Sequence, residues 1–402
     1  MKDTLRGVAV VAHGGGPTQV INASLAGVIE ECSRHPEITA LYGARHGILG
    51  VIGESFINLT EQDPELVQTI GRTPGSAIGS CRRKLSPADY ERILAVFRAH
   101  DVRYFFYTGG NDSMDTASQI ARLARESGYE LRVIGIPKTI DNDLAETDHS
   151  PGYGSAARFI AHALRDIGGD NWALPTPVTV VEVMGRNAGW LVAATSLARH
   201  EPDDAPHLIY LPERPVSEDQ FVAHVEAVYR RLGRAVVAVC EGQTNEKGEP
   251  FGADLIQADG FQHRLAGNLA HVLAQLITRR LGLRARSEKP GLLGRSSAAY
   301  ISETDRLEAW QCGQAAVLAA TRGLTDRMIT LVRESSRPYR SSTGLVPLDQ
   351  VANVERRFPL DWIDPCGHDV LEPFREYAAP LAGAVEPRPK LKDVPVSPRL
   401  RD

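Results

Sequence analysis

The chain has 402 residues, of which 43% are hydrophobic and 24% are charged, and its formal net charge is −5. This length and balance predict a soluble globular protein of about two domains. The mild acidic excess argues against a basic surface for nucleic acid or an anionic membrane. An anionic ligand would therefore need a local cluster of basic side chains.

Five scattered cysteines with no CxxC pair predict reduced thiols rather than a disulfide framework. The N-terminal apolar run is short and leads at once into a glycine cluster, which is not the pattern of a signal peptide. No apolar stretch in the sequence approaches the length of a membrane span. We therefore expect a cytoplasmic protein.

Short apolar runs alternate with amphipathic patterns along the chain. The predicted strands are 8–12, 104–108, 131–136, 178–183, 208–211 and 235–240, and the clearest predicted helices are 23–34, 116–127, 154–167 and 217–232. Near-continuous apolar strands are typical of a parallel sheet that is covered on both faces. The sequence therefore predicts a doubly wound α/β architecture, in which ligands bind at the carboxyl ends of the strands.

The first predicted strand ends in three glycines, Gly14, Gly15 and Gly16, and a helical pattern follows. Glycines let backbone N–H groups approach phosphate oxygens, and a helix N-terminus adds a favourable dipole. No Lys-Ser or Lys-Thr pair closes the loop, so it is not a P-loop. Taken alone, the motif is equally consistent with a phosphate cradle and with an ordinary tight turn.

Two further strand ends carry groups capable of chemistry. The strand 104–108 ends in Gly-Gly-Asn111-Asp112-Ser, whose oxygens suit Mg²⁺ with phosphate but are also ordinary helix caps. The strand 131–136 leads into Lys138, Asp141 and Asp143. An aspartate there could accept a hydroxyl proton, and the lysine could neutralise a phosphoryl group. A polar loop with an Asx turn is the alternative interpretation.

Later motifs are individually weaker. Arg186 and Glu241 follow two strands and suit a sugar phosphate and sugar hydroxyls. A basic stretch over 279–295 is consistent with an ordinary solvated helix face. Residues 152–157 fit GxGxxA, but no apolar strand precedes them, which argues against a dinucleotide site.

Taken in order, these strand-end motifs resemble the phosphofructokinase family. The resemblance runs from about Val8 to the helix after Arg295 and covers the glycine cluster, GGNDS, TIDND, MGR and EG. The later segments Arg337-Pro338-Tyr339-Arg340 and Val351-Ala352-Asn353 are similar to the bacterial branch of the family that uses pyrophosphate.

The resemblance implies a phosphofructokinase fold with two Rossmann-like domains and mostly parallel sheets. The first domain, for pyrophosphate and Mg²⁺, would comprise 1–150 plus about 295–345. The second, for the sugar phosphate, would comprise 151–294 plus part of the C-terminal segment. From about Ala379 the chain is rich in Pro, Lys and Arg, which predicts a surface tail over 379–402.

The resemblance also assigns roles to single residues. It implies that Asp141 accepts the proton of the 1-hydroxyl of fructose 6-phosphate and that Asn111, where the family usually has Asp, holds Mg²⁺. The implied donor-binding residues are Gly15, Gly16, Arg82 and Arg83. The implied sugar-phosphate residues, besides Asp141, are Thr139, Ile140, Met184, Gly185, Arg186, Glu241, Arg286, Leu292 and Arg295.

Two positions point to the phosphoryl donor. Members that use ATP have glycine where this chain has Asp112 and a small residue where it has Lys138. Like charges about 4 Å apart repel by roughly 1–4 kcal/mol, and about 1.4 kcal/mol is a tenfold difference in affinity. A carboxylate at Asp112 would thus disfavour a nucleotide's α-phosphate, while Lys138 would support the leaving phosphate. We expect pyrophosphate as the donor and a reversible reaction.

Two departures concern the sugar site and the assembly. Leu292 stands where many members have His or Tyr, and Pro177 stands where many have an arginine that reaches into a neighbouring subunit. Arg286 matches a second such arginine, so a homodimer or homotetramer is expected. The alternatives left open are an ATP-dependent 6-phosphofructokinase, a dinucleotide-dependent oxidoreductase and a non-catalytic regulatory subunit.

Overall fold

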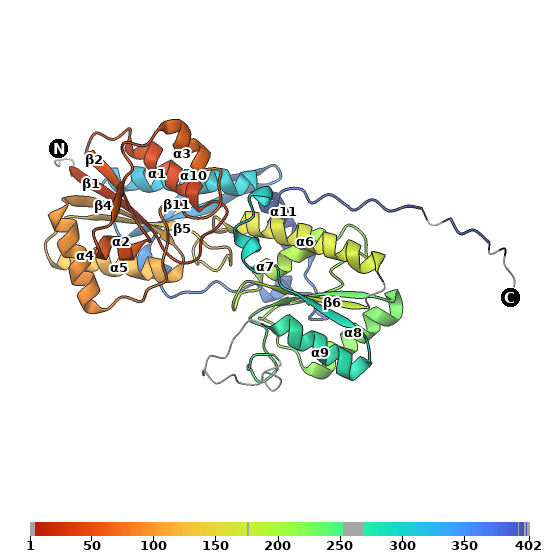
Figure 1. The fold of residues 1–402 in the computed structure, drawn as a ribbon. Coiled ribbons are helices and arrows are strands. Elements are labelled where there is room, and N and C mark those ends of the chain that lie inside the picture. The colour runs from red at the N-terminus through yellow and green to blue at the C-terminus, as the bar shows by residue number, and fades with distance from the viewer. Residues whose placement is uncertain (1–4, 175–176, 252–267, 393, 398, 400–402) are drawn as a thin grey trace.

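The computed structural model describes residues 5–174, 177–251, 268–392, 394–397 and 399. It has two α/β lobes, each built around its own sheet (Figure 1). The first sheet contains β1 (Gly7–His13), β2 (Ile38–Ala44), β3 (Phe56–Asn58), β4 (Val102–Gly109), β5 (Arg132–Pro137), β10 (Arg327–Ser336) and β11 (Tyr339–Pro347). The second contains β6 (Val178–Val183), β7 (Leu208–Tyr210), β8 (Ala235–Cys240) and β9 (Ala285–Glu288).

The helices pack on both faces of these sheets. They are α1 (Ile21–Cys32), α2 (Ile48–Ile52), α3 (Pro64–Ile70), α4 (Pro87–Ala99), α5 (Asn111–Glu126), α6 (Tyr153–Ala173), α7 (Trp190–Ala193), α8 (Glu218–Leu232), α9 (Leu269–Leu281), α10 (Glu303–Thr321) and α11 (Glu372–Ala382). Among the described residues, none of these helices is both long and apolar enough to cross a bilayer.

The first sheet has the strand order β11-β10-β5-β4-β1-β2-β3. Its five central strands run parallel, and β3 and β11 pair antiparallel at the two edges. Side chains of α1 and α10 form a core with one face, and side chains of α2, α4 and α5 form a core with the other. Because both faces are covered, the central strands are apolar along their length, as the sequence predicts.

The second sheet is parallel and has the order β7-β8-β6-β9. Helices α6 and α11 pack on one face, and α8 and α9 pack on the other. The chain crosses between the lobes more than once. Strands β10 and β11 belong to the first sheet and α10 packs on it, whereas α11 belongs to the core of the second lobe. The predicted α/β fold with mostly parallel sheets is therefore confirmed.

Local signals explain several element boundaries. Helix α8 begins with a capping box, in which Ser217 Oγ accepts a hydrogen bond from the Gln220 amide, and it ends at Gly233 with φ +68°. Helix α5 differs from the prediction because it begins at Asn111 rather than 116. Its N-cap is Gly110, so Asn111 and Asp112 lie in the first turn and do not act as caps.

The C-terminal tail also begins later than predicted. Residue Ala379 lies inside α11, and the following Leu381 and Ala382 are buried in the second core. The helix extends to Ala382 because its apolar face packs against α6. This packing outweighs the Pro-rich composition from which the tail was predicted. After Gly383 the chain stays close to the body as far as Lys390, which pairs with Glu201 and Asp204, both at 2.7 Å, and then extends away (Figure 1).

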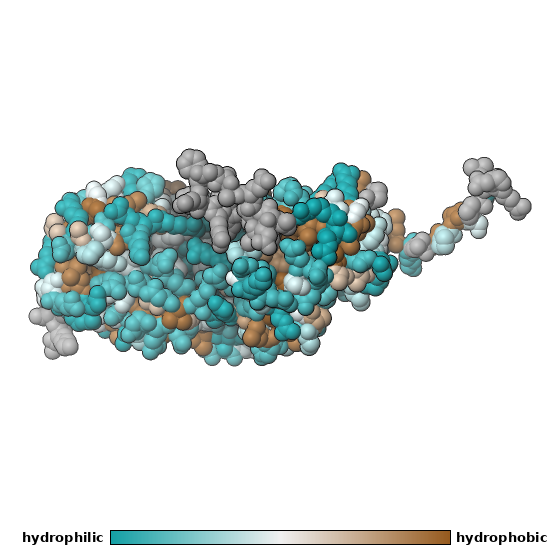
Figure 2. All heavy atoms as spheres, turned by 90° about the horizontal axis from the view of Figure 1, so that it is seen from below, coloured by the Kyte–Doolittle hydropathy of each residue, from teal (hydrophilic) through white to brown (hydrophobic). Residues whose placement is uncertain are grey.

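On the face shown in Figure 2, hydrophilic residues predominate and hydrophobic residues are scattered among them. Such scattered apolar residues are normal for the surface of a globular protein. The apolar residues predicted to form strands lie instead in the two lobes' cores.

Candidate active site

A cleft of about 870 Å³ lies where strands of both sheets end. Strands β1, β4 and β5 of the first sheet and β6 and β8 of the second lead into its walls. It is lined by most of the predicted site residues: Gly15, Gly16, Arg82, Arg83, Asn111, Asp112, Lys138, Thr139, Ile140, Asp141, Met184, Arg186, Glu241 and Arg295. Residues far apart in the sequence are thus brought to one place.

The glycine cluster after β1 is shaped by close neighbours. A Cβ atom on Gly14 would lie 2.2 Å from Ser113 Oγ, and one on Gly16 would lie 2.2 Å from Nη1 of Arg295. Gly15 has φ +78°, which favours glycine. Helix α1 begins only at Ile21, and its first residues do not line the cleft. The guanidinium groups of Arg82 and Arg295, rather than the N-terminus of α1, therefore lie beside the glycine loop at this end of the cleft.

Lys138 follows β5 and points back to the glycine cluster. Its Nζ donates a hydrogen bond to the Gly16 carbonyl at 2.8 Å, and its side chain is buried. Burial lowers the pKa of Lys138 to about 8, although Asp141 and Asp143 oppose this shift. The ammonium group is thus still charged at neutral pH, with the Gly16 carbonyl as its close hydrogen-bond partner among the described residues.

Asp141 lies three residues further along the same loop. Its backbone N–H donates to Thr139 Oγ1 at 3.0 Å, and its carboxylate lies 4.0 Å from Nε of Arg186. Burial, followed by the nearby Asp143 carboxylate, raises the pKa of Asp141 to about 7. A carboxylate that titrates near neutral pH can accept a proton from a substrate hydroxyl more readily than an ordinary aspartate.

On the opposite wall, Glu241 after β8 fixes the turn after β6. Its Oε1 accepts hydrogen bonds from the backbone N–H groups of Arg186 at 3.2 Å and Gly185 at 3.4 Å. Gly185 has φ +145° and lies behind the turn, outside the residues that line the cleft. A Cβ on Gly242 would lie 1.7 Å from the Arg186 carbonyl, so the second residue of the EG motif has to be glycine.

The first turn of α5 supplies the remaining polar groups of the first lobe's wall. Asp112 is exposed to the cleft. The buried Oδ1 of Asn111 has no hydrogen-bond partner among the described residues, and its Nδ2 lies 3.4 Å from Asp143 Oδ2. An unpartnered amide oxygen beside a carboxylate fits a hard cation such as Mg²⁺.

The two predicted donor-binding arginines differ in their surroundings. Arg83 forms an ion pair with Asp89 at 2.9 Å. Arg82 instead lies against the glycine cluster, since a Cβ on Gly16 would be 3.3 Å from its Nη2. Burial and the neighbouring Arg82 charge lower the pKa of Arg295, so these two guanidinium groups repel each other in the absence of an anion.

Besides Gly185, two further predicted sugar-phosphate residues, Arg286 and Leu292, do not line the cleft. Arg286 is half-exposed on the edge strand β9, with its Nη1 3.9 Å from Asp170. Leu292 lies in the 3₁₀ helix η3 (Gly291–Arg295) and its side chain is 65% exposed. Neither residue is among those that line this chain's cleft, whereas Arg295, in the same 3₁₀ helix as Leu292, does line it.

Other residues of the cleft were not assigned by sequence. Asp143, Lys84, Tyr90, Asp115 and Glu355 also line it, as does Asn353, whose Nδ2 donates to Asp115 Oδ1 at 3.1 Å. Asp143 belongs to the TIDND motif, in which an aspartate was predicted to accept a proton, but the pattern does not show that Asp143 lines the cleft together with Asp141. The local pattern around Asn353 indicates no role for that residue. The C-terminal segment reaches the cleft because the Arg356 N–H donates to the Asp143 carbonyl at 2.8 Å.

The GxGxxA motif at 152–157 has a packing role. It begins α6 without a preceding strand, and a Cβ on Gly154 would lie 2.7 Å from the Leu381 carbonyl. The backbone N–H of Gly152 donates to Asp305 Oδ1 at 2.8 Å. The motif does not line the cleft, so its geometry gives no support to a dinucleotide site.

Comparison with known proteins gives consistent matches. The family model described as Phosphofructokinase matches residues 8–320. Two proteins named pyrophosphate–fructose 6-phosphate 1-phosphotransferase are similar to the chain. That of Rhodospirillum rubrum is 41% identical over 404 residues, covering 99% of this chain and 97% of its own. That of Xanthomonas campestris pv. campestris is 43% identical over 384 residues, covering 93% and 91%.

A solved structure is similar over almost the same length. The crystal structure named pyrophosphate-dependent phosphofructokinase from Nitrosospira multiformis superposes with a TM-score of 0.87 at 37% sequence identity. The match covers 97% of this chain and 95% of that one. The similarity thus extends beyond the residues of the family match into the C-terminal segment that reaches the cleft.

Proposed function

The chain belongs to the phosphofructokinase family, and on that premise we propose that it transfers a phosphoryl group from pyrophosphate to the 1-hydroxyl of fructose 6-phosphate. The products are fructose 1,6-bisphosphate and phosphate, and the reaction is reversible. The observation that carries this proposal is that Asp112, Lys138 and Asp141 line one cleft. The names of the similar proteins support the same substrates.

Asp141 acts as the general base. It accepts the proton of the sugar's 1-hydroxyl as the oxygen attacks the phosphorus of the donor, and the bond to the leaving phosphate breaks. Its pKa of about 7 suits this role, because the carboxylate is partly ionised and still basic at neutral pH. Phosphoryl transfer depends mainly on positioning and charge stabilisation, so the surrounding cations supply the rest.

Lys138 and Arg82, both beside the glycine cluster, hold the donor phosphates. The Lys138 ammonium group is buried and bonded to Gly16 O, so its position is fixed before the substrate arrives. Arg82 and Arg295 lie against Gly16, where an anion would relieve their mutual repulsion. Gly15 leaves room for this approach, since a Cβ there would lie 3.2 Å from Lys138 Nζ.

Asp112 sets the preference for pyrophosphate. Its carboxylate faces the cleft from the first turn of α5, on the same wall as Asn111. A nucleotide donor would bring a further phosphate toward this carboxylate, and like charges in a cleft repel. Pyrophosphate ends before that point, so it avoids the repulsion and uses Lys138 instead.

Mg²⁺ is the proposed cofactor, and Asn111 is the residue that would hold it through Oδ1. When bound, Mg²⁺ neutralises negative charge on the donor's phosphate oxygens. The Asp143 carboxylate next to the Asn111 amide orients it and adds negative charge nearby.

The sugar phosphate binds on the wall of the second lobe. Arg186 and Arg295 pair with its phosphate, and Glu241 and the Met184 turn contact the sugar. Thr139 and Ile140 contact the sugar from the loop before the base. In this assignment the lobe containing 1–150 plus about 295–345 binds the donor, and the lobe containing 151–294 binds the sugar.

We further propose a cytoplasmic homodimer or homotetramer. Arg286 is half-exposed on an edge strand, away from its own chain's cleft, which is where an arginine that serves a neighbouring subunit has to be. The five cysteines are free thiols in the structure, as is usual in a reducing compartment.

The test is a coupled assay with purified protein, Mg²⁺, fructose 6-phosphate and either pyrophosphate or ATP. We expect turnover with pyrophosphate and a kcat/KM for ATP at least about tenfold lower. Faster turnover with ATP would contradict the donor assignment. Absence of phosphoryl transfer from both donors, in protein shown to be folded, would contradict the proposed function as a whole.

A further inference from the structure

The loop that carries Asp141 is held from behind by the residue next to it. Asn142 is fully buried and has φ +56°, a conformation that asparagine tolerates better than most residues. Its Oδ1 accepts a hydrogen bond from the backbone N–H of Ser150 at 2.9 Å. Its Nδ2 donates to the hydroxyl of Tyr377 at 2.9 Å. One side chain thus joins the two ends of the loop to helix α11.

The Tyr377 hydroxyl is at the centre of this contact. It donates to the Asp148 carbonyl at 2.7 Å, and it accepts from Asn142 Nδ2 and from Arg356 Nη2, the latter at 3.3 Å. A phenol has one proton to donate and two lone pairs, so its hydrogen-bonding capacity is fully used. The hydroxyl therefore connects the residue after the base with the later part of the same loop.

The Tyr377 ring has little freedom to move. It is packed against Trp190 and Phe374, with ring centroids 5.4 and 6.3 Å away, and the Arg333 guanidinium lies over its face at 4.7 Å. Only 9% of the residue is exposed. A ring held on this many sides places its hydroxyl at a fixed point in the second lobe.

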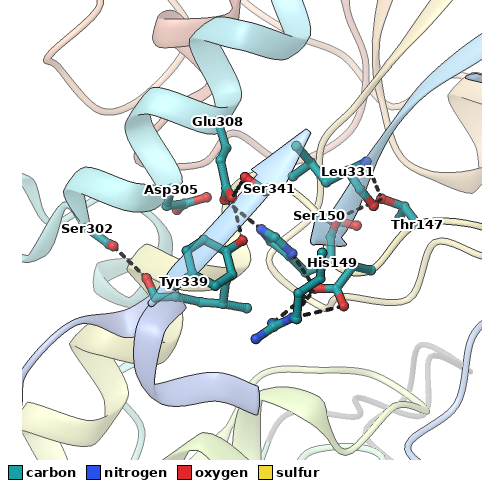
Figure 3. Close-up of polar contacts among 12 residues, drawn as sticks. Thr147, His149, Ser150, Ser302, Asp305, Glu308, Leu331, Tyr339 and Ser341 are labelled. Atoms are coloured by element: carbon teal, nitrogen blue, oxygen red, sulfur yellow. Dashed lines mark hydrogen bonds and ion pairs between the residues drawn. The ribbon is translucent and has the colours of Figure 1, made fainter. Parts of the chain in front are cut away.

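The later part of the loop is anchored separately by a buried group of charges, which we call the His149 cluster: Asp148, His149, Glu308 and Arg333. Figure 3 shows Glu308 and His149 pointing toward each other, with Tyr339 and Ser341 beside Glu308. His149 Nε2 lies 2.6 Å from Glu308, its Nδ1 lies 2.8 Å from Asp148, and Arg333 pairs with Asp148 at 3.0 Å.

Backbone contacts tie this part of the loop to the first sheet as well. The Leu331 N–H donates to Thr147 Oγ1 at 2.9 Å (Figure 3). The Asp148 N–H donates to the Leu331 carbonyl at 2.9 Å. The Tyr377 hydroxyl therefore bonds to a segment that is itself fixed, and it can transmit that rigidity to Asn142.

We propose that Tyr377 is a positioning residue for phosphoryl transfer, which acts through Asn142 to fix the loop that carries Asp141. The inference rests on the proposed function, since it concerns the base of that reaction. It assigns a role to α11, a helix outside the residues of the family match.

The predicted effect falls on the rate rather than on binding. The groups that hold the phosphates, Lys138 and Arg295, do not contact Tyr377 or Asn142 in the described structure. Loss of the hydroxyl would remove the oxygen that accepts the hydrogen bond from Asn142 Nδ2. The Asn142 side chain would then be held less firmly, and the adjacent Asp141 carboxylate could move. Small displacements of a base lower the chance of a productive geometry without weakening substrate binding to the same extent.

The experiment compares Tyr377→Phe with the wild-type protein. We expect kcat to fall about tenfold, while KM for fructose 6-phosphate and for pyrophosphate changes less than about twofold. The matched control is Tyr129→Phe, since Tyr129 is also buried and its hydroxyl lies within hydrogen-bonding distance of the carbonyls of Val102 at 2.6 Å and Phe97 at 3.0 Å, away from the cleft. Equal losses of kcat in both variants would contradict the proposal, and so would an unchanged kcat in Tyr377→Phe.

A second variant tests the route through Asn142. Asn142→Gly keeps the positive φ accessible and removes the side chain. If Tyr377 acts through Asn142, adding Tyr377→Phe to Asn142→Gly changes kcat by less than about twofold. Multiplication of the two single losses would overturn the proposed route. Wild-type turnover of pyrophosphate is measured alongside, so that a failure of the proposed function is seen separately from a failure of this inference.

Discussion

The cleft and the His149 cluster both bury ionisable side chains, but the two regions shift pKa values in opposite senses. In the cleft, burial raises the pKa of Asp141 to about 7 and lowers that of Lys138 to about 8, which disfavours both charged forms. In the cluster, burial opposes charge too, but the close partners outweigh it. They raise the pKa of His149 and lower those of Asp148 and Glu308.

The difference lies in the partners and not in the depth of burial. His149 has a carboxylate on each ring nitrogen. The ion pair that Asp141 makes with Arg186 is long, at 4.0 Å, and the attraction of Arg186 and Lys138 is opposed by the carboxylates of Asp143 and Glu241. Buried groups without close counter-charges exchange protons near neutral pH, and fully paired groups stay charged and serve as anchors. This fold therefore separates a reactive region from a rigid one along a single loop.

The largest effect is expected from removing the base. Asp141→Asn keeps the size of the side chain and abolishes proton acceptance, so kcat for fructose 6-phosphate phosphorylation should fall about 10³-fold. The melting temperature should not fall, because a poorly partnered buried carboxylate is removed. Steady-state kinetics and a thermal melt measure both, and retention of more than a tenth of the activity would contradict the role of Asp141.

A substitution in the His149 cluster should lower the stability of the fold, in contrast to the Asp141 substitution. His149→Gln leaves Glu308 and Asp148 with too little positive charge, and the free energy of unfolding should fall by about 3 kcal/mol or more in a urea titration. The double variant His149→Gln with Glu308→Gln removes both charges of the closest pair and should recover part of that loss. A change below about 1 kcal/mol in the single variant would show that the cluster is not an anchor.

The same cluster predicts how stability depends on pH. Because the folded state raises the pKa of His149 above its unfolded value, its contribution is fully present below the ordinary histidine range. That contribution is lost as the pH rises through the raised value, at up to about 1.4 kcal/mol per pH unit. Urea titrations at a series of alkaline pH values should show this decline in the wild type and a smaller one in His149→Gln.

Variants of Lys138 and Arg83 compare a cation that is held in place for the donor with a cation that already pairs with a carboxylate of the protein. Lys138→Met should lower kcat/KM for pyrophosphate about 10²-fold, because a preorganised positive charge at the donor phosphates is lost. Arg83→Ala is the matched comparison, since Arg83 lines the same cleft but pairs with Asp89. We expect a change below about threefold there. Similar losses in both variants would mean that only the net charge of the cleft matters.

The smallest effect concerns the choice of donor. Asp112→Gly removes the carboxylate on the first turn of α5, and the ratio of kcat/KM for pyrophosphate to that for ATP should shift by about tenfold toward ATP. Parallel assays with the two donors measure this ratio. An unchanged ratio would leave Lys138 as the sole source of the preference.

Sequence patterns predicted the fold and most of the cleft for physical reasons. Strands such as β1 and β6 are covered on both faces, so their apolar runs stand out, and the motifs after them meet because parallel strands end at one edge. Asp141 and Lys138 were found in this way, and the structure places them in one cleft.

The parts that sequence could not give depend on distant segments. Nothing in the local pattern around Tyr377 shows that its hydroxyl contacts Asn142, 235 residues away. His149 was not assigned a role, because its buried partner Glu308 lies 159 residues away in the sequence. Arg286 and Leu292 were assigned by resemblance to the sugar site, but both lie outside the lining of this chain's cleft, since the segment around them turns only Arg295 toward it.

The most direct test of the account is the pH dependence of kcat/KM for fructose 6-phosphate in the wild-type protein with saturating pyrophosphate. A base must be deprotonated to accept a proton, and the pKa of Asp141 is raised to about 7. The rate should therefore fall about tenfold per pH unit below that value. An activity that stays level down to the ordinary aspartate range near pH 4 would show that Asp141 is not the base that the cleft has tuned for this transfer.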